Sequence, residues 1–314
     1  MTDVLRWGRT AYETDAALKL ERDASHRLGL TWSLREERSS PGDMAGIRAL
    51  VVPSKVCVDG AVLDRFSGEL VLTTTSGYDH IDVQACRSRG VVVARCPEAR
   101  RDAVVEQALA LGTSLMRQVP ALGVAAQQGR WARGELEALA PRGLSGATVV
   151  VVGLGVIGQR VAQILTVLGA SVLGVDPNQS PAGITKADLD DSLPHADFVT
   201  LHCSLTGSSV GILDRQRLEQ LPSHAVVVNT ARGPLLDLAA AVQMVESGRL
   251  RGLASDVFPA EPHPDLALNS RHSGVILTPH SAGYTHDLGM RVAREVAANL
   301  TAWQVGERLP GAIG

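Results

Sequence analysis

Short apolar runs alternate with helix-like stretches along most of the chain, and this pattern predicts its architecture. In the first third, buried strands are expected at 49–52, 69–73 and 91–94, and short helices at 60–67 and 82–90. A first strand near Val4–Trp7 is less distinct. Strands that alternate with helices in this way form parallel sheets, so an α/β fold is expected.

The pattern changes after residue 101. Residues 102–118 predict one long helix that stops near Pro120, and 121–128 predict a second helix. Segment 134–146 contains a proline and several glycines, which predicts a connector. Strand-and-helix alternation then resumes, with strands expected at 149–152, 171–175, 198–202, 225–229, 253–257 and 275–277. From residue 287 onward we expect an amphipathic helix and a short tail.

Composition narrows the function classes. The 314 residues suit about two domains of roughly 150 residues each. The 30 basic and 33 acidic residues leave a net charge of −3, which argues against a nucleic-acid partner. No apolar run is long enough to span a bilayer, and the N-terminal residues lack the apolar core of a signal peptide. Four scattered cysteines without a CxxC pair favour reduced thiols in a cytoplasmic protein over disulfides or a zinc site.

The strongest motif is a glycine-rich turn between an expected strand and an expected helix. Gly153, Gly155 and Gly158 form GxGxxG directly after four valines. In this context the first glycine permits a tight turn, the second lets a pyrophosphate approach the backbone, and the third allows close helix packing. Asp176 ends the next strand and would accept hydrogen bonds from the adenosine ribose, which favours NAD over NADP. A glycine-rich turn of another α/β fold is the alternative.

Three polar side chains follow later strands, at the sheet edge where ligands of such folds bind. Arg232 follows the strand at 225–229, and its guanidinium suits a bidentate grip on a carboxylate, although a surface arginine is the alternative. Glu261 and His280 follow the next two strands. A carboxylate orients an imidazole and favours its charged form, so this pair is a candidate acid–base unit. The three together predict a catalytic site.

These motifs resemble the D-isomer-specific 2-hydroxyacid dehydrogenases, most closely their phosphoglycerate dehydrogenase-like branch. The similarity runs from about Leu50 to Gly306, and the combined motifs are highly specific. They are TTTSGYDHID (73–82), DAVVEQALAL (102–111), the GLGVIG turn, NTARG (229–233), DVFPAEP (256–262) and TPH (278–280).

The resemblance implies two Rossmann-like domains with parallel sheets, one flavodoxin-like and one dinucleotide-binding, and an active-site cleft between them. It implies a substrate domain formed by 1–97 and completed by 284–314, around a contiguous NAD-binding domain at 98–283. It also implies a homodimer built largely from the long helices after Asp102.

The resemblance assigns chemical roles to individual residues. His280 would be the acid and base of an NAD-dependent oxidoreductase that interconverts a D-2-hydroxy acid and a 2-keto acid, and Glu261 would be its partner. Arg232 would hold the substrate carboxylate and polarise the keto oxygen, and Asp256 would hold the nicotinamide carboxamide. No metal is needed, because hydride donation belongs to the cofactor. Further cofactor contacts are expected from Val156, Ile157, Thr230, Ala231 and Gly283.

The substrate is expected to be a small 2-keto or 2-hydroxy acid whose carboxylate meets the N–H groups of Ser76 and Gly77. Lys55 lies where relatives present polar or basic side chains to the far end of the substrate, and Arg100 and Arg101 lie between the two domains. One hypothesis is that these cations bind a phosphate or second carboxylate. The alternative is that all three are solvated.

Two other functions stay open on the same fold. The first is a phosphite dehydrogenase-like oxidoreductase; a formate enzyme is disfavoured, since such enzymes carry Gln where Glu261 stands. The second is a non-catalytic, NAD-sensing interaction protein like the transcriptional corepressors that share this fold. Turnover with NADH distinguishes the leading function from the corepressor-like one.

Overall fold

The chain forms two compact units in a computed structural model that describes residues 2–36, 42, 44–264 and 272–313. The first unit is Met1–Arg101 together with Tyr284–Gly314, and the second is Asp102–Gly283. The sequence places the first boundary at 97/98. Helix α4 (Glu98–Met116) begins four residues before the point where the two compact units divide.

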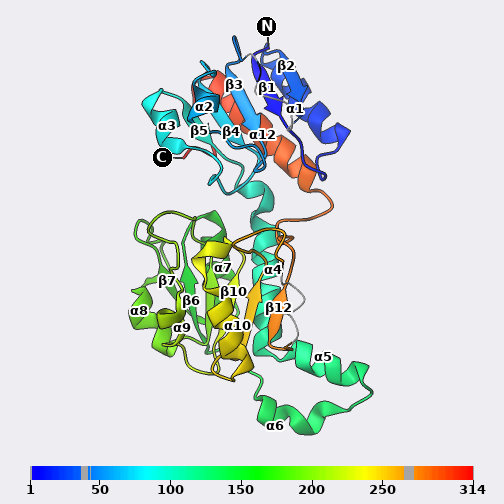
Figure 1. The fold of residues 1–314 in the computed structure, drawn as a ribbon, viewed down its shortest axis with the longest axis vertical. Helices are drawn as coiled ribbons and strands as arrows, with labels where there is room; N and C mark the ends of the chain where they lie inside the picture. The colour runs from blue at the N-terminus through cyan, green and yellow to red at the C-terminus, as the bar shows by residue number, and fades with distance from the viewer. Residues whose placement is uncertain (1, 37–41, 43, 265–271, 314) are drawn as a thin grey trace. The chain divides into compact units, whose positions relative to one another are not determined.

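The first unit is built on a five-stranded parallel sheet in the order β2-β1-β3-β4-β5 (Figure 1). This is the order of flavodoxin-like folds. Its strands are β1 (Val4–Trp7), β2 (Trp32–Arg35), β3 (Ala49–Val52), β4 (Leu70–Thr73) and β5 (Val92–Ala94). Its helices are α1 (Asp15–Arg27), α2 (Gly60–Leu63), α3 (Val83–Ser88) and α12 (Leu288–Gln304).

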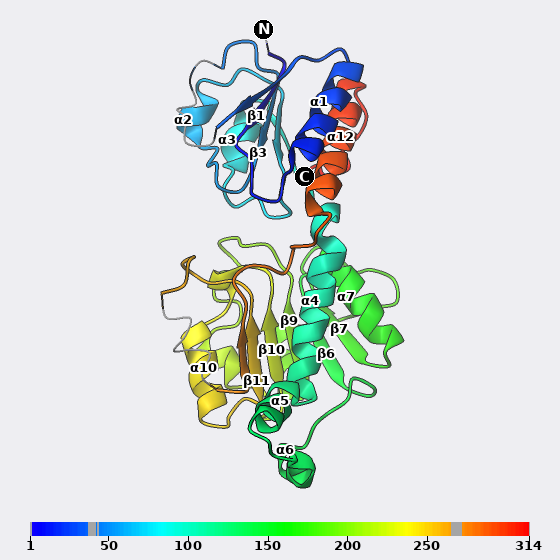
Figure 2. The ribbon, with the colours of Figure 1, turned by 90° about the vertical axis from the view of Figure 1, so that its right-hand side faces the viewer.

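Both faces of this sheet are covered. Leu5 and Leu50 point to the face that packs with α2 and α3, while their neighbours Val4 and Val51 point to the face that packs with α12. Figure 2 shows α1 and α12 side by side on one face. Since successive residues of a strand alternate between faces, strands that are buried on both sides read as continuous apolar runs.

The second unit contains a seven-stranded parallel sheet in the order β12-β11-β10-β9-β6-β7-β8. The chain order reverses between β6 and β9, where ligands of doubly wound sheets bind. The strands are β6 (Thr148–Val152), β7 (Ser171–Val175), β8 (Thr185–Lys186), β9 (Phe198–Leu201), β10 (Val226–Asn229), β11 (Gly252–Ser255) and β12 (Val275–Leu277).

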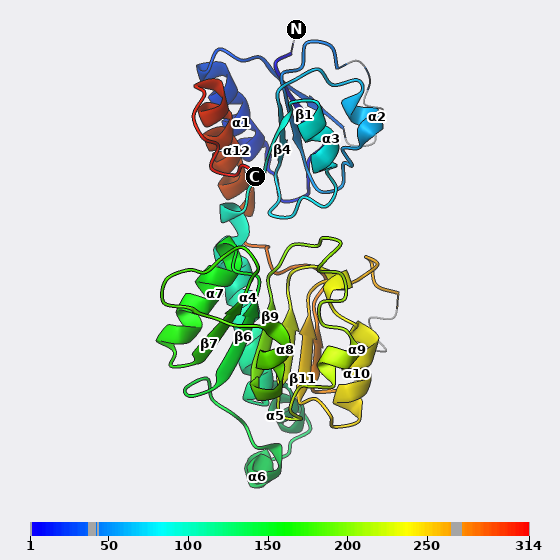
Figure 3. The same cartoon turned by 90° about the vertical axis from the view of Figure 1, so that its left-hand side faces the viewer.

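Helices cover both faces of the second sheet as well (Figure 3). One core packs the sheet against α4 and α7, and the other packs it against α8, α9 and α10. Besides α4, the unit contains α5 (Val119–Gln127), α6 (Leu136–Leu139), α7 (Val156–Val167), α8 (Leu189–Ser192), α9 (Arg215–Leu218) and α10 (Leu238–Glu246). Its 3-10 helices are η1 (Ala132–Glu135), η2 (Leu193–His195) and η3 (Gly233–Leu235).

Side-chain caps explain where many of these helices begin. A Thr or Asp before the first turn accepts one or two of its free N–H groups, as N-cap residues do. These residues are Thr14, Asp59, Asp82, Asp188, Asp214 and Asp237. Helix α7 differs, because its N-cap is Gly155 and no side chain caps it.

The two parallel-sheet units confirm the α/β fold class. The predicted strands at 171–175 and 275–277 coincide with β7 and β12. The segment 134–146 is not a plain connector, because it contains the end of η1 and all of α6. Among the described residues, no helix is long and apolar enough to cross a membrane.

Candidate active site

The glycine turn joins β6 to α7, and each of its three glycines meets a different constraint. Gly153 has φ +93°, and a Cβ there would lie 2.4 Å from the backbone N of Cys203. A Cβ on Gly158 would lie 1.9 Å from the carbonyl oxygen of Gly153. A Cβ on Gly155, in contrast, would meet no atom within 4 Å. The fold itself therefore requires glycine at 153 and 158, whereas at 155 it leaves open space beside the backbone.

That open space suits an anionic ligand. Val156 and Ile157 form the first turn of α7, whose N–H groups have no intrahelical acceptor. The start of a 12-residue helix also carries partial positive charge. A pyrophosphate can approach Gly155 without a steric clash and accept those N–H groups. The turn thus fits the dinucleotide that its motif predicts.

Asp176 follows β7 and organises the same turn. Its Oδ2 accepts the Leu154 N–H at 2.8 Å, while Oδ1 accepts the N–H groups of Asn178 and Gln179 at 2.8 and 2.9 Å. A carboxylate offers about four lone-pair sites, so these bonds leave acceptor capacity for ribose hydroxyls. Asp176 therefore has a structural task beside the one the sequence predicts.

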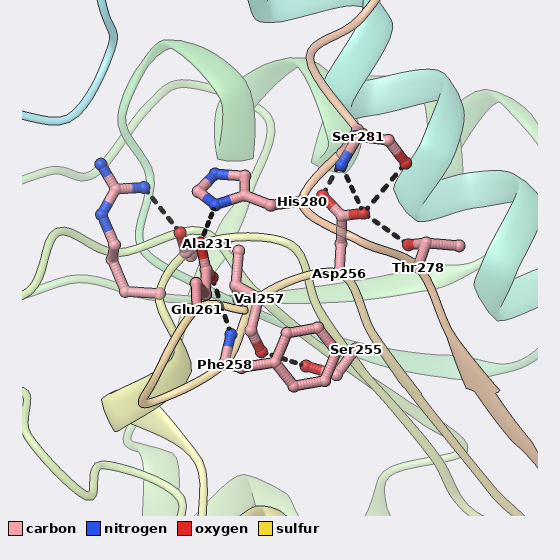
Figure 4. Close-up of polar contacts among 11 residues, drawn as sticks. Ala231, Ser255, Asp256, Val257, Phe258, Glu261, Thr278, His280 and Ser281 are labelled. Atoms are coloured by element: carbon pink, nitrogen blue, oxygen red, sulfur yellow. Dashed lines mark hydrogen bonds and ion pairs between the residues drawn. The ribbon is translucent and has the colours of Figure 1, made fainter. Parts of the chain in front are cut away.

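His280 and Glu261 lie side by side on the loops after β12 and β11 (Figure 4). His280 Nδ1 is 2.7 Å from Glu261 Oε2, and the other carboxylate oxygen accepts the Phe258 N–H at 2.9 Å. The Phe258 bond orients the carboxylate, and the carboxylate in turn orients the imidazole. The two side chains remain 49% and 36% exposed, so solvent or a substrate can reach the ring.

Asp256 is fully buried and fixes the loop that carries His280. Its carboxylate accepts the Thr278 hydroxyl and the N–H groups of Ser281 and Ala282, the latter two at 2.9 and 2.8 Å (Figure 4). His280 itself has φ +52°, in the left-handed region that costs free energy for a residue with a Cβ. The Asp256 carbonyl oxygen accepts the His280 N–H at 2.7 Å and so helps to hold this conformation.

Arg232 lies on the loop after β10, and Asn229 shapes that loop. The buried Asn229 amide donates to the Arg232 carbonyl oxygen at 2.9 Å and accepts the Ala231 N–H at 3.0 Å. Gly233 then allows close packing, because a Cβ there would lie 2.0 Å from the Phe258 carbonyl carbon. The loop of Arg232 is thus packed against the segment whose Phe258 N–H binds Glu261.

A second histidine near the glycine turn is unsuited to proton donation. Burial lowers the pKa of His202 to about 4, and its Nε2 lies 2.9 Å from the Thr200 hydroxyl. Its ring is therefore neutral at physiological pH. Of these two histidines, His280 is the one that contacts a carboxylate and is exposed to solvent.

The structure places the remaining predicted residues in two groups. Thr230, Ala231 and Gly283 lie on the loops after β10 and β12. Ser76 and Gly77 follow β4, and Lys55 is exposed after β3. Arg100 donates to the Thr74 carbonyl oxygen and the Tyr12 hydroxyl, and Arg101 forms an ion pair with Glu98. Both arginines therefore contact protein groups.

A sequence model of the D-isomer specific 2-hydroxyacid dehydrogenase NAD-binding domain matches residues 109–282. The chain belongs to this dehydrogenase family. The matched segment lies within the unit that contains the glycine turn, so the cofactor of this NAD-binding domain is NAD. The expected family and cofactor are thereby confirmed.

Known relatives of this family member support the phosphoglycerate dehydrogenase-like branch. The D-3-phosphoglycerate dehydrogenase of Mycobacterium tuberculosis is 35% identical over 271 residues, which cover 84% of this chain and 51% of that protein. The chain spans about half the length of the curated relatives it matches.

Solved structures show the same fold over nearly the whole chain. A protein of Thermus thermophilus is 28% identical with a TM-score of 0.79, over 99% of this chain and 100% of that one. A D-lactate dehydrogenase of Aquifex aeolicus, solved with NAD and lactic acid, has a TM-score of 0.82 at 23% identity and covers 97% of this chain and 96% of its own. The lower identity of the second match limits it to fold similarity.

The structure adds residues that the sequence reasoning did not single out. Asn229 and Gly233 flank Arg232 and fix its loop. Both residues belong to the NTARG motif, so the motif indicates that they matter, but it does not show which groups they contact. Arg95 donates to the Ser76 carbonyl oxygen at 3.0 Å and has no comparable signal in the sequence. Within the described residues, no three His, Cys, Asp or Glu side chains form a metal site.

Proposed function

We propose that this family member is an NAD-dependent oxidoreductase that interconverts a D-2-hydroxy acid and a 2-keto acid. The observation that carries the proposal is the 2.7 Å pair of His280 Nδ1 and Glu261 Oε2, held on loops of the sheet that also bears the glycine turn. An imidazole oriented by a carboxylate is suited to exchange one proton with a reacting oxygen.

When bound, NADH supplies the hydride for the carbonyl carbon. In that direction, protonated His280 donates its proton to the keto oxygen through Nε2, because Nδ1 faces Glu261. Glu261 stabilises the imidazolium and keeps the ring in place. Arg232 binds the substrate carboxylate and polarises the keto oxygen, since its planar guanidinium can donate to two oxygens. In the oxidative direction, neutral His280 accepts the hydroxyl proton.

The proposal gives the glycine turn and Asp176 the task of holding the cofactor. The turn leaves space at Gly155 for a pyrophosphate, and the first turn of α7 offers N–H groups to it. Asp176 accepts the ribose hydroxyls, while Thr230, Ala231, Asp256 and Gly283 contact the cofactor from the loops after β10, β11 and β12.

The substrate is a small 2-keto acid whose carboxylate meets the N–H groups of Ser76 and Gly77. A second anionic group on the substrate is a further part of the proposal. Lys55 is a candidate for it because it is exposed on the loop after β3. Arg100 and Arg101 are weaker candidates, since both contact protein groups.

A panel of 2-keto acids tests both parts. Each acid is mixed with NADH and the purified chain, and cofactor oxidation is followed by absorbance. Turnover of at least one 2-keto acid to the D-hydroxy acid, identified by chiral chromatography, supports the proposal. No turnover with any member contradicts it. Equal efficiency for apolar and anionic side chains argues against the anionic pocket.

The proposed partner is a second copy of this chain, bound through the segment from α5 to α6. Val119, Val124, Trp131 and Leu136 are large apolar side chains that remain exposed there, and Trp131 is 87% exposed. Such side chains favour burial in an interface. Sedimentation is expected to give twice the 33.1 kDa chain mass for the wild type and a single chain mass for Trp131→Glu. A monomeric wild type contradicts the dimer.

A further inference from the structure

The loop after β4, residues 74–77, has all four of its carbonyl oxygens bound by protein donors. We call it the anion loop. In order along the loop, the donors are the Arg100 guanidinium at 2.6 Å, the Cys96 N–H at 3.1 Å, the Arg95 guanidinium at 3.0 Å and the Thr75 hydroxyl at 2.8 Å. Four bound carbonyls in succession fix the orientation of each peptide plane.

Two of the four N–H groups of the anion loop have an acceptor within the described part of the chain, and two have none. The Thr74 N–H donates to the Val52 carbonyl oxygen, and the Thr75 N–H donates to the Thr73 hydroxyl. Within the described part of the chain, the N–H groups of Ser76 and Gly77 have no acceptor, and both residues are partly exposed. Two adjacent N–H groups without an acceptor, on a backbone that is held in place, can both donate to an anion such as a carboxylate.

Each arginine is itself held by an aromatic ring. The Arg100 guanidinium carbon lies 5.1 Å from the Tyr12 ring centroid, and one of its nitrogens donates to the Tyr12 hydroxyl. The Arg95 guanidinium carbon lies 5.5 Å from the Tyr78 ring centroid. Stacking on a ring restricts the guanidinium, so fewer conformations are lost when it binds the carbonyl oxygen.

We infer that Arg95 and Arg100 are positioning residues that hold the anion loop in the conformation that binds the substrate carboxylate. The inference rests on the proposed function and assigns these arginines a task other than direct substrate contact. Arg100 holds the Thr74 carbonyl oxygen, where the loop leaves β4, so without Arg100 the start of the loop can shift. Arg95 holds the carbonyl oxygen of the peptide that carries the Gly77 N–H, so without Arg95 this peptide can rotate and place a carbonyl oxygen at the site. An oxygen there repels the carboxylate, so binding weakens while the proton transfer at His280 is unaffected.

The test replaces each arginine by methionine, which keeps an unbranched side chain without the guanidinium. Arg89→Met is the matched control, because Arg89 is an arginine of the same unit that pairs with Asp64 at 2.6 Å away from this loop. For Arg95→Met and Arg100→Met we expect the Michaelis constant of the keto acid to rise about tenfold, the effect of losing one charge-assisted hydrogen bond. The turnover number and the NADH dissociation constant are expected to stay within about twofold of wild type.

Direct binding separates this inference from the proposed function. Calorimetric titration of the NADH-loaded protein with oxamate, an unreactive 2-keto acid analogue, needs no turnover. Wild-type binding that weakens about tenfold in the two methionine variants but not in Arg89→Met supports the inference. Equal oxamate affinity in all four proteins overturns it, whatever the keto acid panel shows. A wild type that binds oxamate but reduces no keto acid contradicts only the proposed function.

Two further measurements exclude simpler causes. Arg95→Lys and Arg100→Lys keep a charged donor, so both are expected to bind oxamate with most of the wild-type affinity. They also test the inference if a methionine variant does not fold. The effect of the methionine variants is expected to persist in 0.5 M salt, about the ionic strength at which long-range attraction between exposed charges is largely screened. Loss of the effect in salt shows that the arginines act only by long-range attraction and overturns the positioning role.

Discussion

The two units fix their site loops in different ways. In the second unit the anchors come from the ends of the strands themselves, since Asn229 ends β10 and Asp256 follows β11, and both are fully buried. In the first unit the anion loop after β4 is held by guanidinium groups from residues 95 and 100. Loops anchored by buried strand ends suit chemistry that needs rigid geometry. A loop whose carbonyl oxygens are held by arginines suits binding, because its free N–H groups stay in place for the substrate carboxylate.

This difference predicts that changes in the second unit lower turnover, whereas changes around the anion loop raise the Michaelis constant. The largest effect is expected for His280→Gln, which keeps a polar side chain but cannot transfer the proton. We expect the turnover number to fall by about 10²- to 10⁴-fold, the usual contribution of a general acid. Steady-state kinetics measures this loss, and a fluorescence titration is expected to show unchanged NADH binding.

His195→Gln is the control for that prediction, because His195 is an exposed histidine of the same unit outside the site. Its turnover is expected to equal the wild type. Near wild-type turnover in His280→Gln shows that His280 is not the acid and base. It also contradicts the expectation that changes in the second unit lower turnover.

The cores of the units differ as well, and this sets the second prediction. The first unit buries Arg6 with Glu13 and Glu21, and burial raises the pKa of Glu21 to about 7 although the nearby Arg6 opposes the shift. A carboxyl group whose pKa is higher in the folded protein than in the unfolded chain stabilises the fold. This stabilisation is complete below pH 4.5, the pKa in the unfolded chain, and is lost as the pH rises through 7. Glu21→Gln is expected to abolish this fall in stability with rising pH, because glutamine stays neutral.

We therefore expect the free energy of unfolding of Glu21→Gln, relative to wild type, to rise by up to about 3 kcal/mol between pH 4.5 and 8. Urea unfolding at several pH values measures this difference. Glu69→Gln is the control, because Glu69 is an exposed partner of Arg48 in the same unit. A relative stability that does not change with pH shows that Glu21 is already ionised in the folded protein.

The glycine turn separates stability from cofactor binding within the second unit. For Gly158→Ala we expect a loss of about 1–3 kcal/mol in the free energy of unfolding, since the new methyl group overlaps the Gly153 carbonyl. Gly155→Ala has space for its methyl group and ordinary φ and ψ of −70° and −168°. We expect it to lose less than about 1 kcal/mol, as a weaker N-cap residue.

For NADH binding we expect the opposite ranking, with Gly155→Ala as the more damaging of the two substitutions. For Gly155→Ala we expect an increase of at least about tenfold in the NADH dissociation constant, because the methyl group occupies the space of the pyrophosphate. Thermal unfolding and a fluorescence titration on the same samples give both quantities. Unchanged NADH affinity in Gly155→Ala rules out pyrophosphate binding at this turn.

The sequence predicts the parts of this molecule that depend on neighbours along the chain. The strands β7 and β12 coincide with their apolar runs, and the glycine turn and the Glu261–His280 pair follow strands as expected. For α4 the apolar pattern predicts a start at residue 102, whereas the helix begins at Glu98. Glu295 accepts the N–H groups of Glu98 and Ala99 at 3.1 and 2.8 Å, so a carboxylate almost 200 residues away caps this helix.

The same limit applies to the anchors of the site loops. The NTARG motif contains Asn229, but only the fold shows that its amide bonds both the Ala231 N–H and the Arg232 carbonyl oxygen. Arg95 and Arg100 reach carbonyl oxygens 19 and 26 residues earlier in the chain, a relation that depends on the order of β4 and β5. Such contacts follow from tertiary packing, so no local pattern predicts them.

The smallest expected effect concerns cofactor choice at Asp176. Asp176→Ala removes the ribose acceptor of the proposal and also the bonds to Leu154, Asn178 and Gln179, so it weakens NADH binding for two reasons. The ratio of efficiencies with NADH and NADPH isolates the first reason, because loosening of the loop affects both cofactors alike.

We expect that ratio to fall about tenfold, as the carboxylate no longer repels a 2′-phosphate. Asp188→Ala is the control, since Asp188 is another carboxylate of this unit that accepts backbone N–H groups, those of Asp190 and Asp191. An unchanged ratio in Asp176→Ala, with weaker binding of both cofactors, leaves Asp176 as a loop anchor only. The second unit then fixes the loop of its glycine turn, like the loops of Arg232 and His280, through a residue at the end of a strand.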